Sequence, residues 1–513
     1  MKHIAFPYIA LPLLLLILVA CGQHQVAVPD DFQEVPNQAN MYPDYRDVVI
    51  PPNIAPLNFM LKDSALTEVV ARLKGGDEEF LAGGGKDGKV MMDTTQWRSL
   101  LQASRGGDVS VDLYAKVAGA WKHYPTYTFA VAEDDIDAFL SYRLIEPGYE
   151  LYRQLGLYQR NLTNWQVHAI YENNRGYDDV DNHCINCHNY RNYGTDDMLF
   201  HVRAGHAGTI VIHKDQARKV QIKDSTIITS GVYPSWHPTE RLVAFSTNRT
   251  GQTFHIFHRE KVEVLDEASD LLLYDADRNE VSHILRSRGQ LETFPCWSPD
   301  GRKLYYCSVD LTRDIDVNVS DSLLSLQIIS RNDSLYYDLL SLSFDPATHH
   351  FGEPQLEIDA ASRHRSISVP RVSPDGRYIL YTEGDYGQFH IWHASSDLWV
   401  KDLERDTCYA LTDANSFDSD SYHSWSSNGR WIVFSSRRMD SNYTRPFITY
   451  FDREGKAHKP FVLPQEDPEQ NILLLKSYNV PELTRDAVQI TPEQLCRVIY
   501  DSEGEKATYI PAK

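Results

Sequence analysis

The residues with the clearest chemical potential lie in one short stretch, residues 183–188, which reads HCINCH. Cys184 and Cys187 are three positions apart, and His188 follows the second cysteine directly. Two thiols and an imidazole at this spacing can attach a haem covalently, supply part of a zinc site, or form a redox-active dithiol. The rest of the chain decides between these three chemistries.

Zinc and dithiol chemistry each need partners that the sequence does not offer. A structural zinc site needs four ligands, usually in two close pairs, and the chain has no second CxxC or HxxxH pair. A thioredoxin-type dithiol needs a helix N-terminus after it, because the helix lowers the pKa of a thiol. The flanking segments, YDDVDN and NYRNYG, are acidic and turn-like, and acidic neighbours raise the pKa of a thiol. Haem attachment is therefore favoured.

The segment CINCH matches the attachment pattern CxxCH at every position and resembles c-type cytochromes over these few residues only. The resemblance implies that Cys184 and Cys187 form thioethers to one haem c and that His188 is an axial ligand of its iron. The sixth iron ligand stays open among Met198, His201 and His206, which lie shortly downstream. A thioether ligand would raise the reduction potential relative to a second imidazole.

The start of the chain is typical of an exported protein. Lys2 precedes an apolar run that is too short to span a bilayer as a mature helix, and residues 1–20 are interpreted as a signal peptide. The run ends in LVAC, which resembles the lipobox of bacterial lipoproteins. The resemblance implies cleavage before Cys21 and a lipid on its thiol; an ordinary secretory signal with an incidental cysteine is the alternative. Residues 21–42 contain few apolar side chains and predict a tether.

These features predict a protein of the bacterial cell envelope. The lipid would anchor it in a membrane, facing the periplasm or at the outer membrane, and the leaflet stays open. Haem is attached to c-type proteins outside the cytoplasmic membrane, so the predicted location agrees with the CxxCH motif. The net charge of −21 and the lack of a basic cluster disfavour nucleic-acid binding, which depends on neutralising phosphates.

Four cysteines remain besides the predicted lipid and haem sites, namely Cys296, Cys307, Cys408 and Cys496. An oxidising compartment permits disulfides. Cys296 and Cys307 lie on the two arms of a predicted hairpin, and a bridge between them is one alternative. The turn register puts the two residues off direct opposition, which disfavours the bridge.

A repeat fills the second half of the chain. Four segments share an apolar residue, a turn, an arginine and an apolar strand, and their aligned positions are Trp236, Trp297, Val372 and Trp425. Two of the turns read SPDGR, where proline and aspartate favour the turn and glycine accepts a positive φ. The repeat resembles the TolB-like β-propeller repeat, which implies about six blades over residues 201–465. A sandwich or barrel of repeated hairpins is the alternative, and irregular spacing predicts an insertion around residues 311–335.

The remaining segments complete the predicted organisation. Residues 43–150 alternate as strands around a short helix near TTQWRSLLQAS and predict a β-sandwich-like domain. Residues 151–200 are interpreted as a connector that carries the haem motif at the loop edge of the first blade. Residues 466–513 are interpreted as a C-terminal extension that could complete the propeller. The predicted fold class is therefore mainly β, with an N-terminal sandwich-like domain followed by a propeller.

Together these features favour an envelope-anchored c-type haem lipoprotein that transfers electrons or binds an envelope or redox partner in a redox-linked way. One haem without substrate-activating residues favours a carrier or sensor over an enzyme, and no catalytic residue is assigned. Two alternatives stay open. The protein could be a non-enzymatic propeller scaffold for proteins or glycans without functional haem. It could also be a haem enzyme with an open distal side, in which His201 or His206 acts as acid and base.

Overall fold

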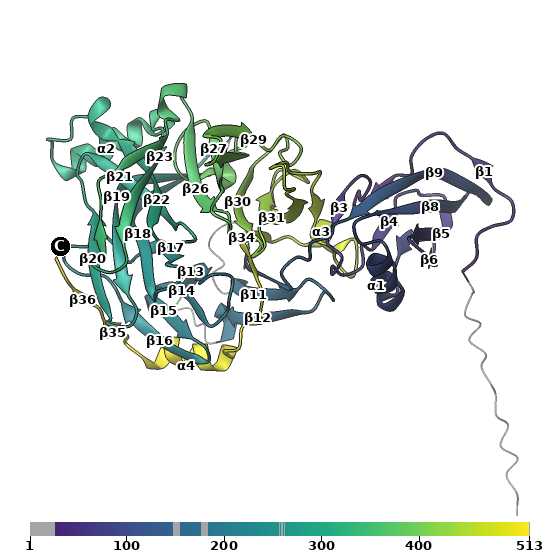
Figure 1. Ribbon diagram of the computed structural model, residues 1–513, viewed down its shortest axis with the longest axis horizontal. Helices are drawn as coiled ribbons and strands as arrows, with labels where there is room; N and C mark the ends of the chain where they lie inside the picture. Colours follow the sequence, from purple (N-terminus) through teal and green to yellow (C-terminus); the bar gives the residue numbers. More distant parts are fainter. Residues whose placement is uncertain are drawn as a thin grey trace, which may run out of the picture.

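The computed structural model describes residues 26–146, 154–175, 183–255, 257, 260 and 262–511. The predicted signal peptide, Cys21 and the first part of the predicted tether lie outside these residues. The described chain forms a small β-sandwich beside a six-bladed β-propeller (Figure 1). The predicted fold class is confirmed. No helix within the described ranges combines the length and apolar character that a membrane crossing requires.

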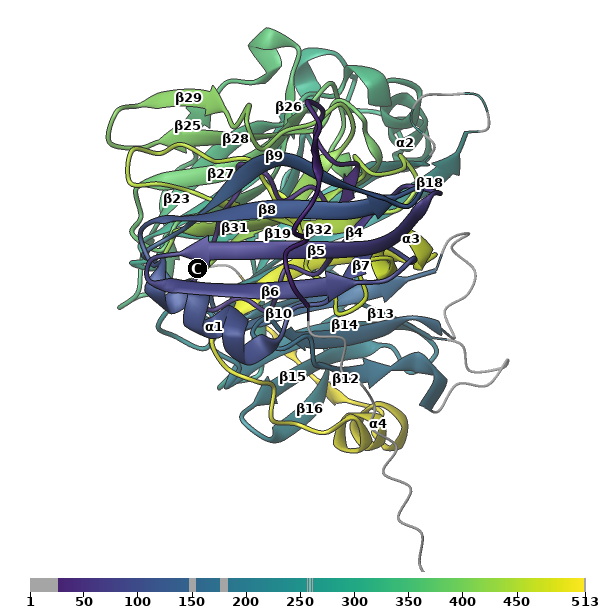
Figure 2. The ribbon, with the colours of Figure 1, turned by 90° about the vertical axis from the view of Figure 1, so that its right-hand side faces the viewer.

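The sandwich consists of two sheets and one helix. The larger sheet contains β1 (Gln33–Glu34), β9 (Ala120–Val131), β8 (Asp108–Val117), β5 (Leu66–Gly75) and β6 (Glu78–Gly84), with β3 (Val49–Ile50) beside β9. The smaller sheet contains β2 (Met41–Tyr42), β4 (Phe59–Leu61) and β7 (Lys89–Val90). Figure 2 views the larger sheet face on, with α1 (Thr94–Ala103) at one end. The Asp93 carboxylate caps α1 by accepting hydrogen bonds from its first backbone N–H groups.

Each propeller blade is built on antiparallel strands, and its first strand lies next to the channel. Blade 1 contains β34 (Ser477–Thr484), β10 (Phe139–Ile145), β11 (Gly156–Asn161) and β12 (Val167–Glu172). Blade 2 contains β13 (His183–Tyr190), β14 (Asp197–Ala204), β15 (Gly208–His213), β16 (Gln216–Gln221) and β35 (Glu505–Lys506). Blade 3 contains β17 (Val232–Trp236), β18 (Leu242–Phe254), β19 (Val262–Asp275), β20 (Glu280–Leu285) and β36 (Thr508–Tyr509).

The other three blades carry the clearest copies of the repeat. Blade 4 contains β21 (Gln290–Trp297), β22 (Lys303–Asp310) and β23 (Asp338–Asp345), with β24 (His350–Phe351) and β25 (Gln355–Ile358) beside β23. Blade 5 contains β26 (Ser366–Val372), β27 (Tyr378–Gly384), β28 (Asp397–Asp402) and β29 (Thr407–Ala410). Blade 6 contains β30 (Asp420–Trp425), β31 (Trp431–Ser436), β32 (Arg445–Tyr450) and β33 (Phe461–Val462). The predicted insertion in blade 4 carries α2 (Asp321–Ser330).

Blade 1 closes the ring because it combines strands from both ends of the propeller sequence. β34 pairs with β10 from Phe139 opposite Thr484 to Ile145 opposite Ser477. β34 also contacts β13 and β30, the first strands of blades 2 and 6. After β34, α4 (Pro492–Asp501) packs against β12 of blade 1 and β16 of blade 2. β35 and β36 then join the outer edges of blades 2 and 3 in parallel (Figure 1).

The propeller starts earlier in the chain than the sequence boundaries placed it. The strands of residues 139–172 form three quarters of blade 1, and β13 and β14 form the inner half of blade 2. These segments were predicted as the end of the sandwich and a connector, because they lack the SPDGR turn that marks blades 4 and 5. The predicted extension at 466–513 supplies the first strand of blade 1.

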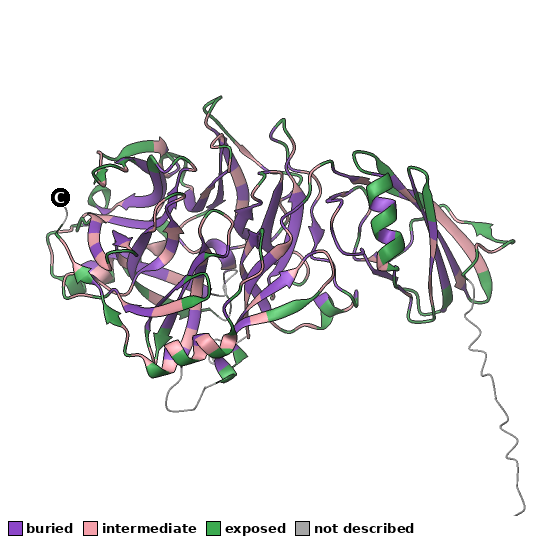
Figure 3. Cartoon of the chain, turned by 60° about the horizontal axis from the view of Figure 1, so that its bottom comes forward, coloured by how far each residue is buried: buried purple, intermediate pink, exposed green. Residues whose placement is uncertain are grey.

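Apolar side chains fill the sandwich and the spaces between blades, as the buried strands in Figure 3 illustrate. One cluster joins both parts of the molecule, because Trp97 and Val111 of the sandwich belong to the same core as Trp431 and Ile448 of blade 6. Cys296 and Cys307 are free buried thiols. Cys307 lies opposite Thr293 rather than Cys296, so the considered disulfide is not formed.

Candidate cofactor site in the propeller channel

The motif HCINCH lies on β13, the innermost strand of blade 2. The pairing of β13 with β14 is irregular between Asn186 and Asn189, and Cys187 has a φ of 54°. A bulge of this kind bends a strand and redirects a side chain. The bulge belongs to a channel strand, whereas the sequence predicted the motif at the loop edge of the blade.

The same bulge recurs in the innermost strand of every blade. Each bulge contains one residue other than glycine in the left-handed region, with φ between 46° and 54°, and each of these residues lines one central cavity. We call these residues the channel ring, and its members are Cys187, Tyr233, Phe294, Val369, Tyr422 and Val480. Residues in this conformation are strained, and such strain commonly accompanies functional sites. Cys187 is therefore the thiol member of a ring whose other members are aromatic or aliphatic.

The central cavity contains about 1370 Å³ of empty space when its open mouth is included. Cys184, Cys187 and His188 all line it. Its remaining walls come from several blades and include Phe389 and Trp392 in addition to the channel ring. A concave space that combines apolar walls with polar groups can hold a cofactor or ligand.

Three arginines give the cavity its charge, namely Arg143 of β10, Arg203 of β14 and Arg371 of β26. Arg203 lies directly opposite Cys184 in the pairing of β13 with β14. The Arg143 guanidinium donates a hydrogen bond to the Ile185 carbonyl oxygen at 2.9 Å. Each guanidinium can pair with a carboxylate in two-pronged geometry. The cavity therefore suits a ligand that carries acidic groups on an apolar body.

Both motif thiols are free and partly exposed to the cavity. Burial raises the pKa of the Cys184 thiol above its usual value, and the positive charges of Arg143 and Arg203 reduce that rise. A thiol with a raised pKa stays protonated near neutral pH, so it is neither a strong nucleophile nor a ready metal ligand by itself.

The imidazole of His188 is buried and neutral. Burial lowers the pKa of His188 to about 3. Its Nε2 atom has no hydrogen-bond partner within the described residues and lies 3.9 Å from Oε2 of Glu482. The Glu482 carboxylate instead accepts hydrogen bonds from Asn189 Nδ2 at 3.1 Å and from the Tyr190 backbone N–H at 3.2 Å. A buried nitrogen without a partner is costly, and a neutral imidazole is the form that binds metals.

The three candidate sixth ligands do not line this cavity. Met198 is fully buried in the core of blade 2. The His201 Nδ1 atom lies 2.9 Å from the Thr209 hydroxyl, and its ring packs against Phe245. His206 lies in the turn after β14, where its ring centroid is 4.4 Å from that of Tyr500. The structure therefore brings Cys184, Cys187 and His188 together but leaves Met198, His201 and His206 elsewhere in blade 2.

Sequence reasoning missed the aromatic members of the channel ring. Tyr233, Phe294 and Tyr422 precede the aligned positions Trp236, Trp297 and Trp425 by three residues each. The repeat alignment contained this signal, because an aromatic residue recurs at that offset. The tryptophans line a second cavity farther along the same strands, yet each is nearly fully buried, in agreement with a packing role.

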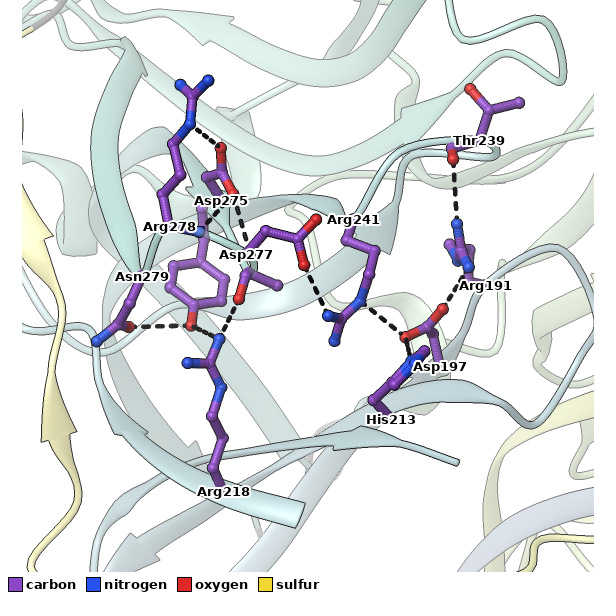
Figure 4. A network of polar contacts seen from close by, with 12 residues as sticks. Arg191, Asp197, His213, Arg218, Thr239, Arg241, Asp275, Asp277, Arg278 and Asn279 are labelled. Atoms are coloured by element: carbon purple, nitrogen blue, oxygen red, sulfur yellow. Dashed lines mark hydrogen bonds and ion pairs between the residues drawn. The ribbon is translucent and has the colours of Figure 1, made fainter. Parts of the chain in front are cut away.

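A buried carboxylate joins blade 2 to blade 3 at the opposite end of β14 from Arg203 (Figure 4). Asp197 pairs with Arg191, with Arg241 Nε at 3.0 Å and with His213 Nδ1 at 2.8 Å. Arg191 also donates to the Thr239 carbonyl oxygen at 3.1 Å. Burial alone would raise the pKa of Asp197, but the His213 hydrogen bond and the two guanidiniums hold it below the usual value.

The donors in the central cavity suit covalent haem. Two free thiols, a neutral imidazole with an unpaired nitrogen, and arginines that could pair with propionates share one space. Among the side chains that the structure describes, no group of three or more His, Cys, Asp or Glu is arranged to hold a bare metal ion.

Comparison of the sequence with protein-family models and with curated proteins finds no match. Among solved structures, the chain is similar to a puromycin-hydrolyzing peptidase of Mycobacterium tuberculosis (10% identity, TM-score 0.35, 83% of this chain) and spans 55% of that peptidase. It is also similar to an auxiliary nutrient binding protein of Bacteroides thetaiotaomicron, with 10% identity and a TM-score of 0.30. That match covers 81% of this chain and 97% of the binding protein. A third similar structure is the β-propeller domain of the Trilobed protease of Pyrococcus furiosus, with 8% identity and a TM-score of 0.32. That match covers 82% of this chain and 98% of the propeller domain.

Proposed function

We propose that this protein is an envelope-anchored c-type haem protein built on a TolB-like propeller. In this proposal haem c is attached in the channel through Cys184 and Cys187, and His188 is an axial ligand of its iron. The role is electron transfer or redox-linked binding of an envelope partner. The observation that carries the proposal is that all three residues of the CxxCH motif line one cavity in the propeller channel.

The haem, when bound, supplies a one-electron redox centre. The residues of this chain would hold the haem and set its reduction potential. Cys184 and Cys187 would hold the porphyrin through thioethers, and His188 would offer the iron the lone pair of a neutral imidazole. Arg143 and Arg203 can neutralise the propionates, while the aromatic walls exclude water and so favour the less charged redox state.

The lipid anchor is the second part of the proposal. Cys21 would carry the lipid, and residues 21–42 would hold the folded part away from the membrane. The Cys21→Ser protein should leave the membrane fraction while keeping its fold. Metabolic labelling with a radioactive fatty acid checks this, and equal labelling of Cys21→Ser would contradict the proposed attachment site.

The haem proposal is tested by exporting the chain together with a cytochrome c maturation system. We expect a covalent c-type pyridine haemochrome spectrum and haem staining after denaturing electrophoresis. Cys184→Ser and Cys187→Ser should each abolish the two-thioether spectrum, because each removes one attachment point. Cys408→Ser is the matched control, because Cys408 is an exposed thiol on blade 5 and should leave the spectrum unchanged.

A folded protein without covalent haem would overturn this proposal. Circular dichroism on the same sample separates that outcome from misfolding. Folded, haem-free protein would favour the alternative in which the propeller is a non-enzymatic scaffold for proteins or glycans.

A further inference from the structure

The second cavity of the channel adjoins the central one. It contains about 950 Å³ of empty space when its open mouth is included, and Pro234 and Arg371 line both cavities. Cys184, Cys187 and His188 line the central cavity and are absent from the walls of the second one. The proposed haem attachment therefore does not account for this space.

The walls of the second cavity combine rigid apolar rings with polar groups. Trp236, Trp297 and Trp425 come from three different blades, and each is at most 5% exposed, so packing fixes the ring. Proline rings supply further apolar surface, namely those of Pro234, Pro238, Pro299 and Pro374. A wall that is already ordered loses little conformational entropy when an apolar ligand packs against it.

Two side chains of opposite charge line this cavity, Arg371 of β26 and Glu482 of β34. They do not form an ion pair with each other, and within the described residues neither has another charged partner. The nearest basic group to Glu482 is Nε2 of His188 at 3.9 Å, and the low pKa of His188 keeps that ring neutral. A partly buried charge without a partner is costly, so both groups favour a ligand that neutralises them.

The Glu482 carboxylate has one oxygen available for a ligand. Oε1 accepts both hydrogen bonds, from Asn189 Nδ2 and from the Tyr190 N–H, whereas no group of the described chain donates to Oε2. Asn189 Oδ1 accepts from the Trp236 backbone N–H at 3.2 Å, which fixes Glu482 beside Trp236, and the Glu482 side chain is 16% exposed. Burial raises the pKa of Glu482 to about 7, and the positive charge of Arg371 opposes that rise.

Arg371 also has donors available for a ligand. Its backbone carbonyl oxygen accepts from Trp425 Nε1 at 3.0 Å, which places the residue beside that ring. Its guanidinium donates to the Pro370 carbonyl oxygen at 2.9 Å and contacts the Cys296 thiol. A guanidinium carries five N–H donors, so these contacts leave enough of them to hold a carboxylate.

We propose that the second cavity binds a free α-amino acid with an apolar side chain. The carboxylate of the ligand pairs with Arg371, its ammonium donates to Oε2 of Glu482, and its side chain packs against the tryptophan and proline rings. A zwitterion neutralises both unpaired charges at once, which a simple anion or a simple cation does not do. The inference goes beyond the proposed function and does not depend on haem.

The test is isothermal titration calorimetry on the full-length protein with three probes at about pH 8, where the Glu482 carboxylate is ionised. L-Phenylalanine carries both charges, N-acetyl-L-phenylalanine lacks the cation, and L-phenylalaninamide lacks the carboxylate. We expect L-phenylalanine to bind at least about tenfold more tightly than either derivative, because each derivative loses a hydrogen bond between charged groups.

Two variants assign the two charges of the ligand to their residues. In Arg371→Gln, L-phenylalanine should lose its advantage over L-phenylalaninamide, and in Glu482→Gln it should lose its advantage over N-acetyl-L-phenylalanine. Arg302→Gln is the matched control, because Arg302 is an exposed arginine of blade 4 outside the cavity. It should leave all three affinities unchanged. Circular dichroism melting shows which variants fold, and if either fails to fold, the three probes on the wild type decide the inference.

The outcomes separate this inference from the proposed function. Absence of L-phenylalanine binding at millimolar concentration, or equal binding of all three probes, would overturn the amino-acid site. Unchanged preferences in folded Arg371→Gln and Glu482→Gln would overturn its location. The double variant Cys184→Ser with Cys187→Ser should bind L-phenylalanine as the wild type does, whether or not the wild type carries haem. Binding that disappears in a folded double variant would overturn a site independent of the motif.

Discussion

Burial sets the protonation of the motif side chains. The low pKa of His188, about 3, keeps its imidazole neutral at every physiological pH, so its nitrogen lone pair is always available. The same burial raises the pKa of the Cys184 thiol and makes its thiolate scarce in the folded channel. One environment therefore favours His188 in its proposed role as a metal ligand and disfavours the thiolate of Cys184 in its proposed reaction with haem.

The buried Asp197 gives a pH-dependent prediction at the scale of one residue. Asp197→Asn should lower the free energy of unfolding by about 3 kcal/mol, because Arg191 and Arg241 lose their buried partner. The folded pKa of Asp197 is below its unfolded value of 3.8, so its stabilisation is present above pH 3.8 and is lost as the pH falls through the folded value.

Urea unfolding at several pH values measures this difference. The gap between wild type and Asp197→Asn should be constant above about pH 5 and should narrow below pH 3.8. Asp277→Asn is the matched control, because Asp277 pairs with the same Arg241 but its side chain is 63% exposed. That control should change stability by less than about 0.5 kcal/mol. A gap that does not depend on pH would contradict the assigned ion pairs.

The residues of the candidate site were predictable to the extent that their chemistry is local. The spacing of Cys184, Cys187 and His188 alone identified the motif, and the structure places all three at one cavity. The other residues that line the cavity were not predictable, because Arg143, Arg371 and Tyr422 come from other blades. Proximity in sequence selected Met198, His201 and His206, whereas strand alternation and pairing decide where those side chains point.

At the scale of elements, the SPDGR turns offer a matched pair of glycines. Gly301 and Gly376 occupy the same turn position, with φ of 68° and 77°. A Cβ atom on Gly301 would lie 2.3 Å from Nε2 of His237, whereas a Cβ atom on Gly376 would meet nothing within 4 Å. The His237 Nε2 atom also lies 3.0 Å from the Gly301 carbonyl oxygen, a contact that joins blades 3 and 4.

Gly376→Ala should therefore cost about 1 kcal/mol, which is the penalty of the left-handed backbone alone. Gly301→Ala should cost at least about 1 kcal/mol more, because the new methyl group displaces the His237 ring. Chemical denaturation of both variants measures the difference. Equal costs would show that His237 moves aside freely and that this contact does not hold the two blades together.

The elements that the sequence predicted best are those with turn chemistry of their own. The hairpins of blades 4 and 5 follow from SPDGR. The short helix predicted near TTQWRSLLQAS is α1, which the Asp93 carboxylate caps. Blade 1 was missed because no single stretch of sequence encodes it. Its pairing of β34 with β10 joins residues more than 300 positions apart, and no local pattern reports such a contact.

At the scale of the whole molecule, the closure of the ring gives a truncation prediction. A chain ending at residue 476 lacks β34, so β10, β13 and β30 lose their shared neighbour at the channel. We expect this chain to lose cooperative unfolding and to aggregate, because it exposes a long unpaired strand edge.

A chain ending at residue 503 is the control for the truncation. It keeps β34 and α4 and lacks only β35 and β36, which add short outer edges to blades 2 and 3. It should stay folded with a slightly lower melting temperature. Calorimetry and size-exclusion chromatography compare the two chains. A folded monomer from the chain ending at 476 would contradict the importance of the closure.

The closure of the ring by β34 also determines when the thiols of Cys184 and Cys187 become buried during folding. If the chain is exported as proposed, Cys184 and Cys187 cross the membrane before residues 477–484 do, because export of a signal-bearing chain proceeds from its N-terminal end. Until β34 arrives, the strand beside β13 is missing and the channel is open along one side. During that interval both thiols are closer to bulk water and easier to ionise than in the finished ring. The pairing of β34 (Ser477–Thr484) with β10 therefore ends the period in which both thiols are easily reached from water.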